Sequence, residues 1–174
     1  YVLTTPLQLA VMTARCVNGG YAVMPKLTRN AIDEGGDRAS AADFPKIGIS
    51  ARSRQILMHS LDEAMNHPRG TAYSSRISEP GRVAGGKTGT AQVRRITMME
   101  RESGVKKNKD RPWRERDHSL FVGYAPVDKP KYAVSVVVEH SGGGSKTAAP
   151  IARDVLKEVQ RLYAPSQLAR RGVT

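Results

Sequence analysis

The first twenty residues carry a helical pattern of apolar positions. Thr5 and Gln8 have the spacing of a capping box, and Pro6 suits the first position of a helix. The paired glycines at 19 and 20 end the pattern. We expect this helix to bury one face, made of Leu7, Ala10, Val11, Ala14 and Val17.

A second helix is predicted after Ser50, a favourable N-cap residue, and Pro68 and Gly70 end it. Before it, residues 21–32 suggest two short extended segments, followed by an acidic, glycine-rich turn at residues 33–37. The apolar stripe of the second helix consists of Leu57, Leu61, Ala64 and Met65.

From Val83 the apolar period changes from that of a helix to that of a strand. Strands are predicted within residues 83–93, 118–126 and 131–140, the last two forming an antiparallel hairpin with a turn at residues 128–130. A terminal helix should pack over the sheet through Ile151, Val155, Leu156, Val159 and Leu162.

This order of elements predicts an α/β (α+β) fold, in which helices flank an antiparallel sheet. One domain should span residues 1–164, with residues 94–117 as a charged loop between strands and residues 165–174 as a flexible tail. A chain of 174 residues is long enough for a single core. Its apolar runs are short, so no membrane-spanning helix is expected.

Charge adds a second constraint, since 28 basic against 16 acidic residues give a net charge of +12. Such a balance favours anionic partners, and a basic nucleic-acid-binding module is one alternative. Trp113 lies among basic residues, but no recognition helix accompanies it, so we interpret its surroundings as a solvated loop with one packed Trp. Cys16 is interpreted as a buried thiol, and the four histidines show no metal-ligand spacing.

The stretch GRVAGGKTGTAQV, residues 81–93, fits two chemical patterns. Counted from Gly81 it is G-x-x-x-x-G-K-T, the phosphate-binding loop of nucleotide hydrolases; counted from Lys87 it is K-T-G, a strand motif of serine acyl-transfer enzymes. A phosphate loop needs a buried strand before it and a helix after it. Both flanks fail, because the preceding residues are polar and a glycine follows the Lys-Thr pair.

The strand interpretation accounts for more of the same residues. Glycines remove side chains where another backbone or a substrate comes close, and such an edge strand can pair with an extended peptide. A lysine beside it supplies positive potential for a carboxylate, and threonine hydroxyls supply neutral donors. Alternation puts Lys87, Gly89 and Ala91 on one face and Thr88, Thr90 and Gln92 on the other.

With its surroundings, this strand resembles a known family. GGKTGTAQV, the hairpin and the terminal helix are similar to the C-terminal half of the penicillin-binding transpeptidase domain, and YVLTTPLQLAVMTARCVNGG resembles a helix of class B penicillin-binding proteins. The long charged loop is most similar to that of the elongation-type enzyme, penicillin-binding protein 2. The resemblance covers nearly the whole chain, and it fits a cell-wall synthase better than a serine β-lactamase or an unrelated α/β domain.

The resemblance implies a peptidoglycan D,D-transpeptidase that works through an acyl-serine and is trapped by β-lactam antibiotics. Lys87 would polarise the site and help hold the donor carboxylate or the proton relay. The hydroxyls of Thr88 and Thr90 would bind that carboxylate, and the NH of Thr90 would be one of two oxyanion donors. Gly89 and Gln92 complete the expected substrate-binding set.

The family pattern also requires a nucleophile motif S-x-x-K and a second motif S-x-N, and we assign neither to this chain. We therefore expect it to be the distal part of a longer polypeptide and to be inactive alone. The implied location is the periplasmic face of the bacterial inner membrane, with the anchor outside this chain. Expected partners are the stem peptide, β-lactams, the missing N-terminal part of the domain and other cell-wall synthesis proteins; no cofactor, metal or nucleic acid is expected.

Overall fold

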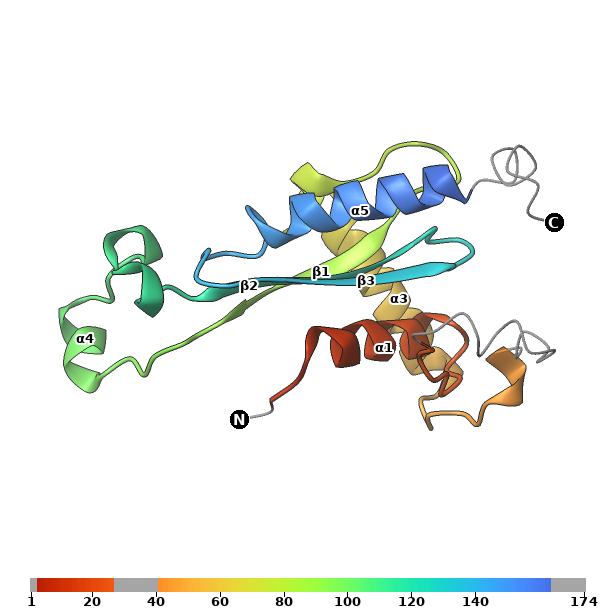
Figure 1. Ribbon diagram of the computed structural model, residues 1–174, viewed down its shortest axis with the longest axis horizontal. Coiled ribbons are helices and arrows are strands. Elements are labelled where there is room, and N and C mark those ends of the chain that lie inside the picture. The colour runs from red at the N-terminus through yellow and green to blue at the C-terminus, as the bar shows by residue number, and fades with distance from the viewer. Residues whose placement is uncertain (1–2, 27–40, 164–174) are drawn as a thin grey trace.

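A three-stranded antiparallel sheet, in the order β1-β2-β3, is the frame of the molecule. The computed structural model describes residues 3–26 and 41–163. Figure 1 shows α5 on one side of the sheet, α1 and α3 on the other, and α4 at the tip of an arm that extends from one end. The elements are α1 (Pro6–Val17), α3 (Ala51–Asn66), β1 (Gly85–Ala91), α4 (Met98–Ser103), β2 (His118–Ala125), β3 (Tyr132–Val138) and α5 (Ala148–Leu162).

Both predicted helix starts are confirmed. The amide of Gln8 donates to Thr5 Oγ1 (3.2 Å) and the amide of Thr5 donates to Gln8 Oε1 (2.8 Å), which completes a capping box at α1. At α3 the amide of Ser53 donates to Ser50 Oγ (3.0 Å). These bonds satisfy amides that lack a partner within the helix.

The predicted strands and hairpin are also confirmed. β1 pairs with β2 from Gly85↔Tyr124 to Ala91↔His118, and β2 pairs with β3 from Ser119↔Val138 to Ala125↔Tyr132, both antiparallel. The turn between β2 and β3 contains a cis bond before Pro126. β2 is therefore the central strand, and β1 and β3 have one open border each within the described residues.

Two aromatic side chains of β2 organise the packing on opposite faces. Phe121 is fully buried with the alanines of α5 and with Leu156, while fully buried Tyr124 packs against Val17 of α1 and Leu61 of α3. Residues 121 and 124 differ by an odd number, so strand alternation sends their side chains to opposite faces. Burial of each ring stabilises the fold by about 1.5–3 kcal/mol, so β2 anchors both helix layers.

The predicted buried faces of α1 and α5 are only partly buried. Leu7 is 47% exposed, and Ile151 and Val155 are 43% and 47% exposed. On α5 three alanines are buried together with Leu156, because small side chains let the helix approach the sheet closely. The buried positions are Thr13 and Val17 on α1, and Ala148, Ala149, Ala152, Leu156 and Gln160 on α5.

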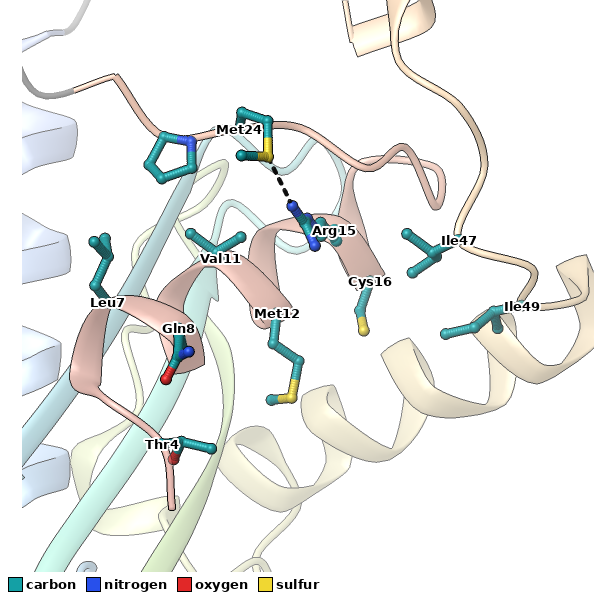
Figure 2. A pocket seen from close by; sticks show the side chains of 11 residues that line it. Thr4, Leu7, Gln8, Val11, Met12, Arg15, Cys16, Met24, Ile47 and Ile49 are labelled. Carbon is teal, nitrogen blue, oxygen red and sulfur yellow. Dashed lines mark hydrogen bonds between the residues drawn. The ribbon is translucent and has the colours of Figure 1, made fainter. Parts of the chain in front are cut away.

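The uncovered face of α1 lines an open groove of about 600 Å³. Figure 2 shows Leu7, Val11, Met12 and Cys16 along this face, with Ile47 opposite. Cys16 is half-buried rather than buried, and desolvation raises the pKa of its thiol, which disfavours the reactive thiolate.

The segment after α1 forms less regular structure than predicted. Tyr21 makes a single antiparallel bridge with Lys46, and no strand forms within the described residues 21–26. The second extended segment, the acidic turn at 33–37 and the tail at 165–174 lie outside the described residues.

Candidate functional site

The K-T-G motif lies within β1, at the border of the sheet. The strand runs from Gly85 to Ala91 and pairs with β2 alone among the described strands. The next helix along the chain, α4, begins only at Met98. A phosphate loop would need a helix directly after Thr88, so this alternative is not supported.

Lys87 and Thr88 lie together and contact a residue that the sequence did not single out. Lys87 Nζ donates to the Thr88 carbonyl at 2.9 Å and lies 3.5 Å from Thr88 Oγ1. Thr88 Oγ1 in turn donates to Thr71 Oγ1 at 3.1 Å. Thr71 lies between α3 and the next 3₁₀ turn, so no local sequence signal predicts this contact.

The bond from Lys87 also indicates which backbone groups of β1 lie at the open border. An ammonium group reaches the Thr88 carbonyl, so we infer that this carbonyl points away from β2. In an antiparallel strand the NH and C=O of one residue point to the same side of the strand. The NH and C=O of the residue two positions later point to that side as well. The NH of Thr90 therefore lies at the same open border as the carbonyl of Thr88.

An open cavity of about 550 Å³ lies beside Lys87. Its other wall comes from α3 and the segment that follows, including His59, Glu63, His67 and Thr71. Lys87 is exposed at this cavity. An extended chain with a carboxylate would meet a cation and hydroxyl groups at one place.

The other predicted site residues fall at different places along β1. Gly89 pairs with Leu120, and Thr90 pairs with Ser119 and is exposed. Gln92 is exposed and follows the last residue of the strand. The structure thus brings Lys87 and Thr88 into contact, while Gln92 forms no hydrogen bond with either of them within the described part of the chain.

The S-x-x-K spacing does occur in the chain, contrary to the sequence-based prediction: Ser103 precedes Lys106 by three positions. Ser103 ends α4, and its Oγ donates to the Met99 carbonyl at 2.7 Å. Gly104 follows with a φ of 102°, which stops the helix before Lys106. The spacing therefore does not bring the amine beside the hydroxyl on one helical turn, as i and i+3 positions would.

The charged segment 94–117, here called the arm, is folded and not a solvated loop as predicted. Thr97 and Glu100 form a capping box at the start of α4. Both oxygens of Glu100 also accept hydrogen bonds from the Arg94 guanidinium at 2.8 Å. This bidentate ion pair links the first residue of the arm to α4.

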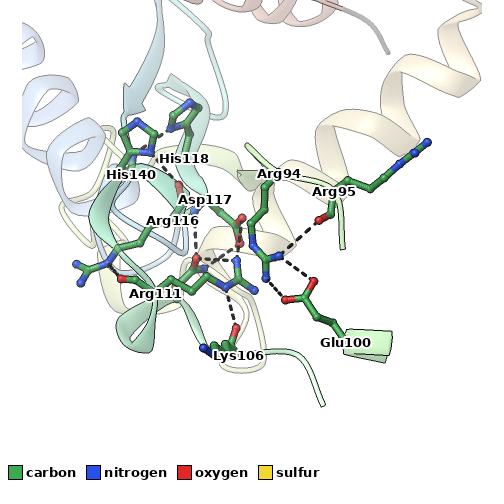
Figure 3. Close-up of polar contacts among 10 residues, drawn as sticks. Arg94, Arg95, Glu100, Lys106, Arg111, Arg116, Asp117, His118 and His140 are labelled. Carbon is green, nitrogen blue, oxygen red and sulfur yellow. Dashed lines mark hydrogen bonds and ion pairs between the residues drawn. The ribbon is translucent and has the colours of Figure 1, made fainter. Parts of the chain in front are cut away.

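A buried ion pair closes the second half of the arm (Figure 3). Arg111 Nη1 lies 3.4 Å from Asp117 Oδ1, and both side chains are nearly buried. Asn108 donates to the other carboxylate oxygen (2.9 Å) and accepts from the Asp117 amide (3.0 Å). Because hydrogen bonds satisfy the buried charges, the network holds the arm at the start of β2.

Trp113 is less packed than predicted, with 56% of its surface exposed. The centroid of its ring lies 4.5 Å from that of the His140 ring, and the His140 centroid lies 4.6 Å from that of the His118 ring. The contact joins the arm to the ends of β2 and β3. Among the described residues, no cluster of three or more His, Cys, Asp or Glu side chains has metal-binding geometry.

Comparisons with known proteins point to one family. The family described as Penicillin binding protein transpeptidase domain matches residues 2–157. The peptidoglycan D,D-transpeptidase MrdA of Haemophilus influenzae is 36% identical over 164 residues, covering 90% of this chain and 24% of that protein. MrdA of Acinetobacter baumannii is 33% identical over 150 residues, covering 84% and 21%. The chain thus spans about a quarter or less of these relatives.

Solved structures agree with the sequence comparisons. Pseudomonas aeruginosa PBP2 in complex with WCK 5153 matches with a TM-score of 0.67 and 30% identity, over 90% of this chain and 30% of that chain. The complex between PBP2 and MreC from Helicobacter pylori matches with a TM-score of 0.67 and 27% identity, over 92% and 25%. The helix-flanked antiparallel sheet is therefore the arrangement that these transpeptidase domains share.

The Arg94–Glu100 pair should make the arm sensitive to acid. Hydrogen bonds from Arg94 and then from the Thr97 amide lower the pKa of Glu100 from 4.5 to about 2. A carboxylate whose pKa falls on folding stabilises the fold above pH 4.5, and that contribution disappears as the pH falls through about 2. We expect hydrogen exchange in residues 94–103 to accelerate across this window.

The variant Glu100→Gln should show fast exchange in the same segment already at pH 7, with little further change in acid. Glu102→Gln is the matched control, because Glu102 makes no ion pair within the described residues. If Glu100→Gln exchanges at the wild-type rate at pH 7, the pair does not hold the arm.

Proposed function

The chain belongs to the penicillin-binding protein transpeptidase domain family, and from that premise we propose that it is the C-terminal part of a peptidoglycan D,D-transpeptidase of the PBP2 type. Residues 1–164 would form part of the transpeptidase domain, and the nucleophilic serine would come from the rest of the polypeptide. The enzyme would work at the periplasmic face of the bacterial inner membrane. Within the described residues, no helix is long and apolar enough to cross a membrane.

The observation that carries this proposal is the open border of β1 beside Lys87 and Thr88. A stem peptide that ends in a D-alanine carboxylate can lie along such a border by β-augmentation. Lys87 and the hydroxyls of Thr88 and Thr90 would attract its carboxylate, while Gly89 and Gln92 would contact the peptide chain. The exposed positions of Lys87 and Thr90 support these roles.

The proposed reaction begins when the serine hydroxyl attacks the carbonyl of the penultimate D-alanine. The serine proton passes to a nearby base, an acyl-serine forms and the terminal D-alanine leaves with a proton. An amine of a second stem peptide then attacks the acyl-serine and releases the serine. The NH of Thr90 would stabilise the tetrahedral oxyanion, a contribution worth about 10²- to 10³-fold in rate. β-Lactam antibiotics would acylate the same serine.

The exposed apolar faces support the proposal that another part of the same domain covers this chain. α1 and α5 both pack on β3, and each leaves apolar side chains exposed, Leu7 and Met12 on α1 and Ile151 and Val155 on α5. β3 itself has an open border within the described residues. Such faces are unusual on an isolated soluble domain and mark a surface that is buried by a partner.

Labelling with a fluorescent penicillin tests the proposal directly. In the full-length protein, the label should appear on a serine outside this chain, and the isolated chain should remain unlabelled. Digestion of the labelled protein followed by mass spectrometry locates the acylated serine. A full-length protein that is not labelled, or a label on any serine of this chain, would contradict the proposed function.

Lys87→Ala in the full-length protein should keep the fold and slow acylation by about 10²-fold, as for the loss of other preorganised electrostatic groups. Lys87 is exposed, so its removal leaves no cavity in the core. Stopped-flow acylation and the melting temperature together separate the two effects. The control is Lys129→Ala, an exposed lysine of the hairpin turn; equal acylation rates for both variants would exclude the role of Lys87.

The arm is the proposed contact for another protein of cell-wall synthesis. A related PBP2 forms a complex with MreC, which makes an MreC-type protein the candidate partner. The arm presents exposed Lys106, Lys107 and Lys109 at the far end of the molecule from the hairpin turn.

Charge reversal of these three lysines to Glu should weaken binding to the partner by at least tenfold, since each exposed charge contributes up to about 1 kcal/mol. Titration calorimetry with the full-length protein and an MreC protein from the same organism measures the change. Reversal of Lys129 and Lys131 in the hairpin turn provides the control. If the arm variant and the control variant bind the partner with equal affinity, the contact lies outside the arm.

A further inference from the structure

Gly144 lies directly over the backbone of the K-T-G strand. A Cβ at this position would clash with the Leu120 carbonyl and would lie 2.5 Å from the Gly89 carbonyl and 3.0 Å from the Gly89 nitrogen. Gly89 and Leu120 are paired residues of β1 and β2. Only a residue without a side chain can lie at this distance from the pair.

Glycine is needed at this position for space and not for backbone conformation. Gly142, two positions earlier, has a φ of 87°, where glycine is favoured for its conformation. Gly144 does not fall in that left-handed region. Its requirement therefore comes from the close approach of two backbones.

The turn that carries Gly144 is held on both sides. The amide of Gly142 donates to the Asp117 carbonyl at 2.9 Å, and the amide of Ala149 donates to the Gly144 carbonyl at 2.9 Å. Asp117 belongs to the buried network of the arm, and Ala149 is fully buried in the first turn of α5. An added methyl group therefore has little room to push the turn outward.

Of the two strands that an added Cβ would meet, β1 is the one that would move, because β2 is paired on both sides. Gly89 lies between Thr88 and Thr90, and β1 has an open border, so it can shift without displacing another strand among the described residues. A shift at Gly89 moves the Thr88 hydroxyl and the NH of Thr90 together. Misplacement of reacting groups by about 1 Å can cost about 10²-fold in rate.

We propose that Gly144 is a positioning residue: because it has no side chain, it sets the position of the K-T-G strand relative to the bound substrate. The inference rests on the proposed transpeptidase function. It assigns no contact between Gly144 and the substrate: Gly144 acts through Gly89.

Gly144→Ala in the full-length protein, compared with Gly143→Ala, tests the inference. Gly143 is exposed, and a Cβ there meets no heavy atom within 4 Å, so the neighbouring variant adds the same methyl group without a clash. The readout is the limiting rate of acylation by a fluorescent penicillin at saturation. The total label at completion counts the active molecules, so the rate refers to folded protein only.

We expect Gly144→Ala to lower the limiting rate about 10- to 100-fold, while Gly143→Ala stays within about twofold of the wild type. A merely structural role would lower the melting temperature and the amount of label and leave the rate per active molecule unchanged. That result would overturn the inference. Absence of label in the wild type would instead refute the proposed function.

A second variant covers the case in which Gly144→Ala does not fold. One extra glycine inserted after Gly144 adds no side chain and releases the turn from its position over Gly89. It should also slow acylation and should accelerate hydrogen exchange in residues 85–91. The control inserts one glycine after Gly104, an exposed position with open space around it. Equal acylation rates for the two insertions would overturn the inference.

Discussion

The fold depends on how closely other groups approach the backbone of β1. Gly85 faces the Tyr124 ring, where a Cβ would lie 2.9 Å from a ring carbon, and Gly86 faces the Phe121 ring. Further along, Gly89 lies against Gly144. The two aromatic anchors of the core thus occupy the space that β1 leaves empty. Because packed interiors resist changes of even one methyl group, this crowding fixes the strand that carries Lys87.

The helices on both faces of the sheet leave apolar side chains exposed. α5 covers one face through three alanines and Leu156, while Ile151 and Val155 are exposed. α1 covers the other face and leaves Leu7 in an open groove. β3 also has an open border among the described strands.

The arm shows how local pairing can order a highly charged segment. Of its nine basic and five acidic residues, the pairs Arg94–Glu100 and Arg111–Asp117 hold its two halves. Asp117 also accepts the Gly142 amide, so the arm is joined to the turn that carries Gly144. The arm and the K-T-G strand are therefore parts of one connected structure.

Sequence by itself determined the elements whose causes are local. The capping box at Thr5, the N-cap at Ser50 and the period-two pattern of the strands involve neighbours in the chain, and each predicted the right element. The K-T-G motif also identified β1 as a strand and predicted the family, since its surroundings resemble one known fold. The pairing of the arm was missed, although Thr97 and Glu100 have the spacing of a capping box.

Only the tertiary structure decided which faces are buried and what lies beside the strand. Periodicity shows that α5 has an apolar face, but whether Ala152 or Val155 meets the sheet depends on how closely the helix packs. Thr71 is 17 residues from Thr88, and Gly144 is 55 residues from Gly89. No local pattern records such contacts, because they form only when the folded chain brings distant backbones together.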